Sequence, residues 1–146
     1  MKKGFTILEL LVVIMVISIL IGIALPRFKG MQDEGNIAKA KGELRTLQVA
    51  LESYYIHNAN AYPTGLATLT AATPAILTTI PNDPFNSAAV ATAYGYVRAG
   101  TGSKFYVIFS GGINATCVAS FTASNVVSET DTSCIYVSNA SQDSVP

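Results

Sequence analysis

Glu9 is the residue of this sequence most suited to chemistry, because it is an acid within an apolar stretch. The 21 residues that end at Leu25 are apolar apart from four positions: Thr6, Glu9, Ser18 and Gly22. An ionisable side chain in such a stretch is a functional candidate, since it is costly to bury unless a group of opposite charge pairs with it. The pattern therefore predicts that Glu9 forms an ion pair.

Catalytic constellations are missing from the sequence. His57 is the only histidine, and the partners that a general base requires do not accompany it. We find no phosphate-binding glycine loop, zinc pattern or nucleophile elbow. The sequence predicts neither an enzyme nor a cofactor.

The apolar stretch is long enough to cross a membrane. As a helix, its 21 residues extend roughly 31 Å, about the thickness of the hydrocarbon core of a bilayer. Lys2 and Lys3 precede it, and the positive-inside tendency then places the N-terminus in the cytoplasm. We expect a single-pass membrane protein with its N-terminus in the cytoplasm.

A family resemblance rests on this same stretch. Lys3-Gly4, followed by Phe-Thr-Ile-Leu-Glu and an apolar helix up to Pro26, resembles the leader and N-terminus of type IV pilins and the related pseudopilins. The resemblance implies that a prepilin peptidase cuts after Gly4 and methylates Phe5. It also implies that Glu9 is the assembly residue of a helical homo-oligomeric filament, built by pilus or secretion machinery in the inner membrane.

The physical chemistry of cleavage agrees with this resemblance. Removing residues 1–4 takes away both lysines and creates a positive amine on Phe5, so that Glu9 is the other charge of the apolar segment. Opposite charges attract strongly at low dielectric, and each added subunit can satisfy the glutamate of a neighbour with its own amine. Before the cut Phe5 has only an amide, which suppresses premature assembly.

Two other interpretations compete with this one. A secretory signal peptide would use Gly22-Ile23-Ala24 as its cleavage site, but the apolar run exceeds the usual ~7–15 residues. A plain single-pass anchor leaves Glu9 unexplained. The mature N-terminus separates the three interpretations, since it would be Phe5, Leu25 or Met1.

Beyond Pro26 the helix is expected to continue with a kink and to become amphipathic. One stripe recurs at helical spacing: Ile37, Ala40, Leu44, Leu47, Leu51 and Tyr54. The charged residues lie mostly off that stripe. We expect one helix of about 50 residues that ends near His57, with its amphipathic part at 26–57 packed on a C-terminal domain. Ser18 and Gly22 could allow close approach between helices of different subunits.

Residues 58–146 are expected to form a connecting region and an antiparallel β domain, which gives an α+β fold. A short helix is expected at Leu66 to Ala71. On the second predicted strand, Phe105, Val107 and Phe109 share one face, and the stripe of the long helix should cover the apolar face of the sheet. About four strands are predicted, with a polar loop from Ala123 to Ser133: Tyr94 to Arg98, Lys104 to Ser110, Cys117 to Thr122 and Cys134 to Ser138.

Cys117 and Cys134 are the only cysteines, and in an exported domain an even pair predicts a disulfide. Pilins often have a C-terminal disulfide loop, so this feature favours a pilin. Turn sequences such as Pro81-Asn82-Asp83-Pro84 instead resemble major pseudopilins. The calcium ligands of that family are not matched, because no acidic residue lies between Asp83 and Glu129. No metal site is predicted; Glu129 and Asp131 are the remaining candidate carboxylates.

Charge argues against nucleic acid as a partner. Nine basic residues balance nine acidic residues in the whole chain, and loss of Lys2 and Lys3 leaves seven against nine.

Taken together, the resemblance at the N-terminus and the cysteine pair favour the subunit of an extracellular type IV pilus. A major-type pseudopilin of a type II secretion system is the alternative, and an exported binding domain with a cleaved signal peptide is a third possibility.

Overall fold

The computed structural model describes residues 4–85, 93–113, 115–130 and 134–140. The chain divides into two compact units, Met1–Gly35 and Asn36–Pro146. Helix α1, Ile7–His57, contributes to both of them, and its 51 residues and its end at His57 confirm the expected length. The helix includes Pro26 without interruption, so the kink predicted there stays a prediction.

The second unit contains the remaining elements. Helix α2, Ala67–Ala71, lies where a short helix was expected. Strands β1, Gly95–Ala99, and β2, Phe105–Ser110, form the expected hairpin, with Val97 opposite Val107. Strand β5, Ile135–Ser138, pairs with the other edge of β2, so the sheet order is β1-β2-β5 and all pairs are antiparallel.

A second sheet of two strands differs from the prediction. Strand β3, Ala119–Phe121, is shorter than the predicted Cys117 to Thr122, and it pairs with β4, Val127–Glu129. The loop predicted from Ala123 to Ser133 was therefore wrong in part, since β4 lies within it. The strand was missed because Val127 is the only apolar residue of its three, too few for a recognisable alternation.

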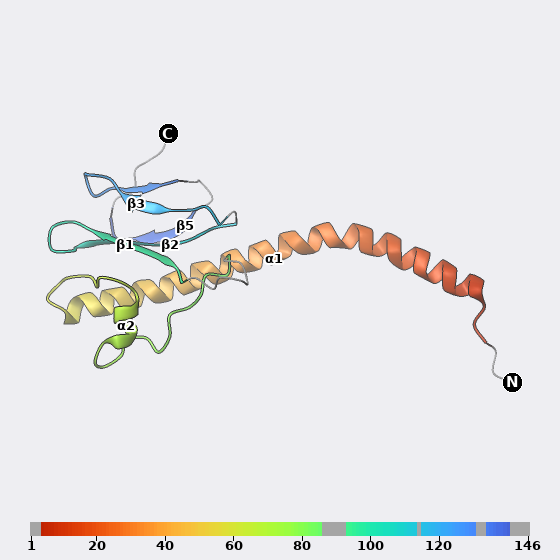
Figure 1. Cartoon of the computed structure of the whole chain (residues 1–146), viewed down its shortest axis with the longest axis horizontal. Helices are drawn as coiled ribbons and strands as arrows, with labels where there is room; N and C mark the ends of the chain where they lie inside the picture. The colour runs from red at the N-terminus through yellow and green to blue at the C-terminus, as the bar shows by residue number, and fades with distance from the viewer. Residues whose placement is uncertain (1–3, 86–92, 114, 131–133, 141–146) are drawn as a thin grey trace. The chain divides into compact units, whose positions relative to one another are not determined.

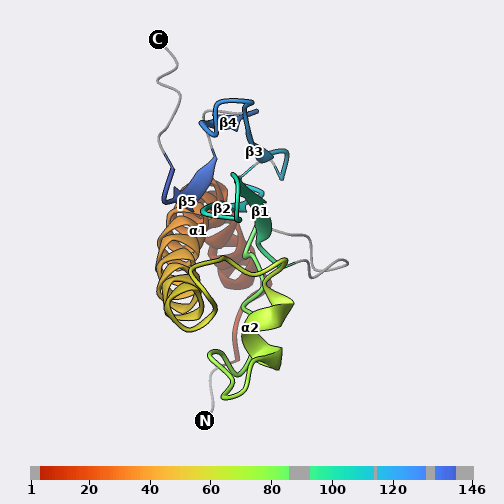
Figure 2. The ribbon, with the colours of Figure 1, turned by 90° about the vertical axis from the view of Figure 1, so that its left-hand side faces the viewer.

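The two sheets and α1 form three layers in the second unit (Figure 2). The predicted stripe of α1 provides one side of the core, and four of its members are fully buried: Ala40, Leu44, Leu47 and Leu51. Tyr106 and Ile108 of β2 pack against these residues. On the opposite face of β2, Val107 packs with Ala119 and Val127 of the smaller sheet. The central strand β2 is thus buried on both faces.

This arrangement corrects one expectation about β2. The face that carries Val107 and Phe109 was expected to receive the long helix, but it packs on the two-stranded sheet. The helix instead contacts the face of Tyr106 and Ile108. Both faces of β2 are apolar. The alternation of side chains along the strand therefore does not show which face packs on the helix and which packs on the second sheet.

Candidate assembly site at the start of the long helix

The expected cleavage point lies in an exposed segment. Gly4, Phe5 and Thr6 precede α1 and belong to no helix or strand, and the side chain of Phe5 is 82% exposed. Leader residues 1–3 lie outside the described residues. A peptidase needs an accessible, non-helical bond, and the Gly4–Phe5 bond meets both conditions.

Thr6 and Glu9 cap the first turn of α1. The backbone N–H of Thr6 donates to Glu9 Oε2 at 3.1 Å, and the Thr6 hydroxyl donates to the same oxygen at 3.0 Å. In return the backbone N–H of Glu9 donates to Thr6 Oγ1 at 3.2 Å. This reciprocal arrangement is a capping box, which satisfies backbone donors that the start of a helix leaves free. The Thr-x-x-Glu spacing would have revealed it, but our sequence reasoning missed this role of Thr6.

The carboxylate of Glu9 keeps one oxygen free of hydrogen bonds in the described part of the chain. Both bonds from Thr6 reach Oε2, and the described residues place no cation beside Glu9. The side chain is exposed. Glu9 is therefore held in position by its own helix, while Oε1 remains available to a positive group from elsewhere.

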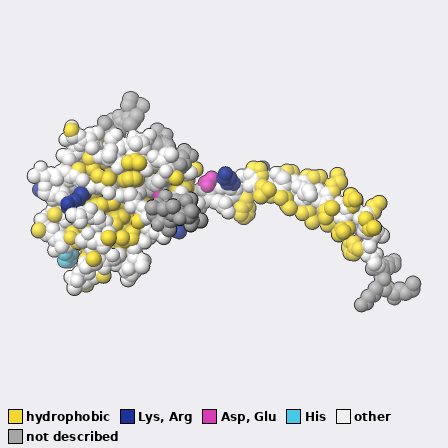
Figure 3. All heavy atoms as spheres, viewed as in Figure 1, with side chains coloured by type: hydrophobic (Ala, Val, Ile, Leu, Met, Phe, Trp, Pro, Cys, Tyr) yellow, Lys and Arg dark blue, Asp and Glu magenta, His cyan; other side chains and the backbone are white. Residues whose placement is uncertain are grey.

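No residue in the apolar first half of α1 is buried within this chain. Its most apolar window has a mean hydropathy of 3.0 and no buried residue. Figure 3 shows hydrophobic side chains along this part of the helix, and large ones are exposed throughout, including Ile7 and Leu25. By length and composition the helix can cross a membrane. An apolar surface of this extent indicates a membrane or a partner as its environment.

Ser18 and Gly22 remain compatible with close helix packing. The Ser18 hydroxyl donates to the carbonyl of Ile14 at 2.7 Å, so its polar group is satisfied within the helix. At Gly22 a Cβ atom would meet nothing within 4 Å, which leaves the surface open there. The role of these two residues between subunits stays a prediction.

In the second unit, two glutamates of α1 bind tyrosine hydroxyls. Tyr94 donates to Glu43 Oε2 at 2.6 Å, and Tyr62 and Tyr106 both donate to Glu52 Oε1 at 3.0 Å. Burial, followed by the neighbouring glutamate, raises the pKa of each of these tyrosines above its ordinary value. The sequence predicted that the charged residues lie mostly off the buried stripe, and it did not reveal these bonds. Tyr94 is 51 residues from Glu43, and Tyr106 is 54 residues from Glu52.

Asp83 joins the connecting region to the end of β2. Its carboxylate is buried and accepts hydrogen bonds from the Ser110 hydroxyl at 2.7 Å, the Gly111 N–H at 2.6 Å and the Phe85 N–H at 3.1 Å. The turn sequence around Asp83 was recognised from the sequence, but this contact was not. The carboxylate stabilises the fold by satisfying these donors.

The predicted disulfide between Cys117 and Cys134 is present, with a Cα–Cα distance of 5.3 Å. It links the loop after β2 to the residue before β5. The described residues contain no group of three His, Cys, Asp or Glu side chains that could hold a metal ion. Asp131, the second candidate carboxylate beside Glu129, lies outside the described residues.

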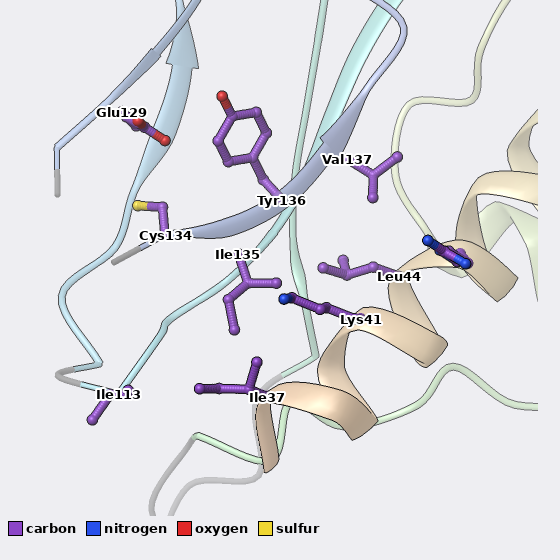
Figure 4. A pocket seen from close by; sticks show the side chains of 10 residues that line it. Ile37, Lys41, Leu44, Ile113, Glu129, Cys134, Ile135, Tyr136 and Val137 are labelled. Carbon is purple, nitrogen blue, oxygen red and sulfur yellow. The ribbon is translucent and has the colours of Figure 1, made fainter. Parts of the chain in front are cut away.

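A pocket of about 620 Å³ lies between α1 and β5 in the second unit (Figure 4). Aliphatic side chains such as Ile37 and Val137 line it, together with Lys41, Arg45 and Glu129. The lining residues include no histidine and no hydroxyl nucleophile beside a base, and Cys134 is in the disulfide. The pocket has no arrangement that points to catalysis.

Two family descriptions match this chain. The prokaryotic N-terminal methylation motif matches residues 1–25, and type II secretion system protein G matches residues 27–128. The first match contains Gly4, Phe5 and Glu9, the residues that the sequence singled out. The second covers most of the domain that packs on α1.

Individual relatives agree with these matches. The chain is 32% identical over 62 residues to type II secretion system core protein G of Pseudomonas aeruginosa, which covers 42% of this chain and 43% of that protein. It is 30% identical over 100 residues to the core protein G of Klebsiella pneumoniae, covering 59% and 71%. The type IV major pilin protein PilA of Myxococcus xanthus is 38% identical over 54 residues, covering 37% and 24%. The chain thus spans less than half the length of the first and third relatives. No solved structure matches it.

These comparisons favour the pseudopilin alternative over the type IV pilus subunit that the sequence alone favoured. The cysteine pair was taken as favouring a pilin, but a disulfide indicates an oxidising compartment and does not distinguish one kind of filament from another. The protein G match extends over about 100 residues, whereas the pilin match covers a shorter part of the chain. The chain belongs to the type II secretion system protein G family.

Proposed function

We propose that this chain is a major-type pseudopilin, the structural, non-enzymatic subunit of a type II secretion filament. The match of residues 27–128 to protein G of that system supports this function most directly. The precursor is inserted in the inner membrane with its N-terminus in the cytoplasm. A prepilin peptidase cuts it after Gly4 and methylates Phe5, and the mature chain polymerises through the apolar half of α1.

The geometry of Glu9 supports the assembly step. Cleavage produces an amine on Phe5, and the capping box leaves Oε1 of Glu9 without a hydrogen bond within the described residues. The amine of a neighbouring subunit can therefore bind Glu9 without opening the first turn of α1. In the apolar interior of a filament, such a pair is strong and removing one partner is costly.

A type IV pilus subunit is the second candidate. It is supported by the match to PilA of Myxococcus xanthus and by the disulfide between Cys117 and Cys134. Deleting the gene separates the two candidates. For a pseudopilin, secreted proteins accumulate inside the cell envelope while surface pili remain; for a pilus subunit, surface filaments are lost and secretion continues.

Processing and assembly are tested on the full chain in its own cells. We expect N-terminal peptides that begin at methylated Phe5, measured by mass spectrometry of the chain purified from the cell envelope. Glu9→Gln should leave membrane insertion intact and reduce incorporation into filaments at least about tenfold, since it removes a buried charge pair. Asp33→Asn, which neutralises an acid outside the apolar stretch, is the matched control and should incorporate normally. A mature chain that begins at Leu25 would contradict the proposal, because the apolar helix would be lost.

A further inference from the structure

Four charged residues follow the apolar stretch in the first unit, and none of them has a partner in the described part of the chain. They are Arg27, Lys29, Asp33 and Glu34. The salt bridge found among the described residues joins Lys39 to Glu43, in the other unit. Figure 3 shows basic and acidic side chains near one another where the hydrophobic surface of α1 ends. Lys29 and Glu34 are both exposed, so their charges can be matched from outside.

Glu34 lies on the same face of α1 as Glu9. The two residues are 25 positions apart within one helix, which is about seven turns at 3.6 residues per turn. They therefore project within about 20° of each other around an ideal helix. One face of the first unit thus presents two carboxylates, one at each end of the apolar stretch.

Lys29 projects from the opposite side of the helix. It is five residues from Glu34, which corresponds to a rotation of about 140°, and five-residue spacing does not bring side chains together within one helix. A shallow hollow of about 830 Å³ lies on the Lys29 side, where Gly22 has no side chain and where Pro26 and Phe28 also line the surface. This face can receive a second helix.

We propose that, in the filament, Lys29 of one copy pairs with Glu34 of the next copy, whose helix lies along the hollow beside Gly22. The inference rests on the proposed function, since it takes the second copy as the occupant of this face. A single displacement of the second copy along the helix axis satisfies two ion pairs. The Phe5 amine of one copy pairs with Glu9 of the next, four residues further along the sequence, and Lys29 pairs with Glu34, five residues further along. Both pairs therefore require the second copy to be displaced along the helix axis by about 6–8 Å, at 1.5 Å per residue.

The two donors and the two acceptors are spaced alike along the chain. Phe5 and Lys29 are 24 residues apart, and Glu9 and Glu34 are 25 residues apart. In copies packed side by side without an offset, the donor and the acceptor of each pair would lie at different positions along the helix axis. Because Lys29 and the two glutamates lie on different sides of α1, the contact is head-to-tail and repeats indefinitely, as a helical filament requires. The Lys29–Glu34 pair acts mainly on the register between copies, since exposed charges fix alignment more than they add affinity.

Charge reversal tests the pair in the full chain, with filament yield measured by immunoblot of the filament fraction separated from the cell envelope. Lys29→Glu and Glu34→Lys should each lower the yield about fivefold, the upper range for a partly exposed ion pair. The exchange of both charges in one chain should restore it. Arg27→Glu and Asp33→Lys are matched controls with the same charge changes at neighbouring positions, and they should stay near the wild-type yield. Equal losses for the pair and for the controls would overturn the inference.

Cysteine cross-linking tests the offset without reliance on yield. Chains carrying Lys29→Cys and chains carrying Glu34→Cys, with different tags, are produced together and their filaments are oxidised. We expect mixed dimers, and we expect few dimers when Lys29→Cys is produced alone. Dimers of Lys29→Cys alone at the same level would show an unshifted contact and refute the pairing. Filaments of the wild-type chain test the proposed function separately: if none form, that function fails, whereas wild-type filaments without the mixed dimers defeat only this inference.

Discussion

Tyr106 donates its hydroxyl to Oε1 of Glu52 at 3.0 Å, although 54 residues separate the two in the chain. Tyr62 donates to both oxygens of the same carboxylate, at 3.0 Å each, and its ring packs edge-on against that of Tyr106 at 4.5 Å. One glutamate of α1 therefore fixes the connecting region and the central strand together. The helix is attached to the β domain by polar bonds as well as by the apolar stripe.

Removing the Tyr106 hydroxyl should weaken this attachment. We expect Tyr106→Phe to lower the free energy of unfolding by about 1–2 kcal/mol, because a hydrogen bond to a charged group is lost while Tyr62 still satisfies the carboxylate. Chemical unfolding of the detergent-solubilised full chain measures the change. Tyr136→Phe is the matched control, since the Tyr136 hydroxyl has no hydrogen bond in the part of the chain that the structure describes. A similar loss in both variants would contradict the prediction.

Alkaline pH should destabilise the second unit. Burial raises the pKa of Tyr62, Tyr94 and Tyr106 in the folded chain, whereas the unfolded chain titrates near the ordinary tyrosine value of about 10. The folded state therefore holds protons that the unfolded state releases, and stability is unaffected below about pH 10 and falls above it. Unfolding curves at about pH 9 and about pH 11 test this sign. Tyr94→Phe should reduce the slope, and an unchanged slope would exclude Tyr94 as a contributor.

Asp83 should tolerate no loss of its charge. In Asp83→Asn one of the acceptor oxygens becomes an N–H donor that faces the donors of Ser110, Gly111 and Phe85. We expect a loss of about 2–3 kcal/mol of unfolding free energy, since buried donors are left unsatisfied. Thermal unfolding followed by circular dichroism measures it. Asp33→Asn, at a half-buried position of α1 whose carboxylate has no hydrogen bond or ion pair among the described residues, should leave the transition within experimental error. Wild-type stability of Asp83→Asn would refute the role of this carboxylate.

The disulfide should stabilise a domain that still folds without it. Its two cysteines are 17 residues apart, and a closed loop of that size contributes about 3 kcal/mol in the chain-entropy model. Cys117→Ser combined with Cys134→Ser should therefore unfold at lower urea concentration. Reduction of the wild-type chain should produce the same shift, and the double variant should not respond to the reductant. A response of the double variant would show that reduction acts elsewhere.

The sequence predicted the elements with strong local signals. The extent of α1 follows from 21 apolar residues and a six-residue stripe, and the hairpin of β1 and β2 follows from alternation on both sides of a glycine-rich turn. The disulfide followed from the even number of cysteines. In each case the information lies within one segment, or in residues too rare to allow an alternative.

What the sequence did not provide depends on contacts between distant segments. Glu52 could not be matched to Tyr62 and Tyr106, because a charged residue off the apolar stripe of a helix normally faces solvent. Asp83 could not be matched to Ser110, because it lies in a turn region 27 residues away. The three residues of β4 are stabilised by pairing with β3 rather than by their own pattern. The capping box of Thr6 and Glu9 is different, since its spacing was readable in the sequence and was overlooked.

If the chain is cut after Gly4 as proposed, the start of α1 at Ile7 determines how far the new chain end can move. Phe5 and Thr6 alone remain ahead of the helix, and two extended residues reach at most about 7 Å. Under the proposed cleavage, the positive terminus would therefore be confined near the first turn and would sample only a small volume around its proposed partner, Glu9 of a neighbouring subunit. Any change that delayed the start of the helix would lengthen this tether and dilute the terminal charge, even if every residue of the contact were kept.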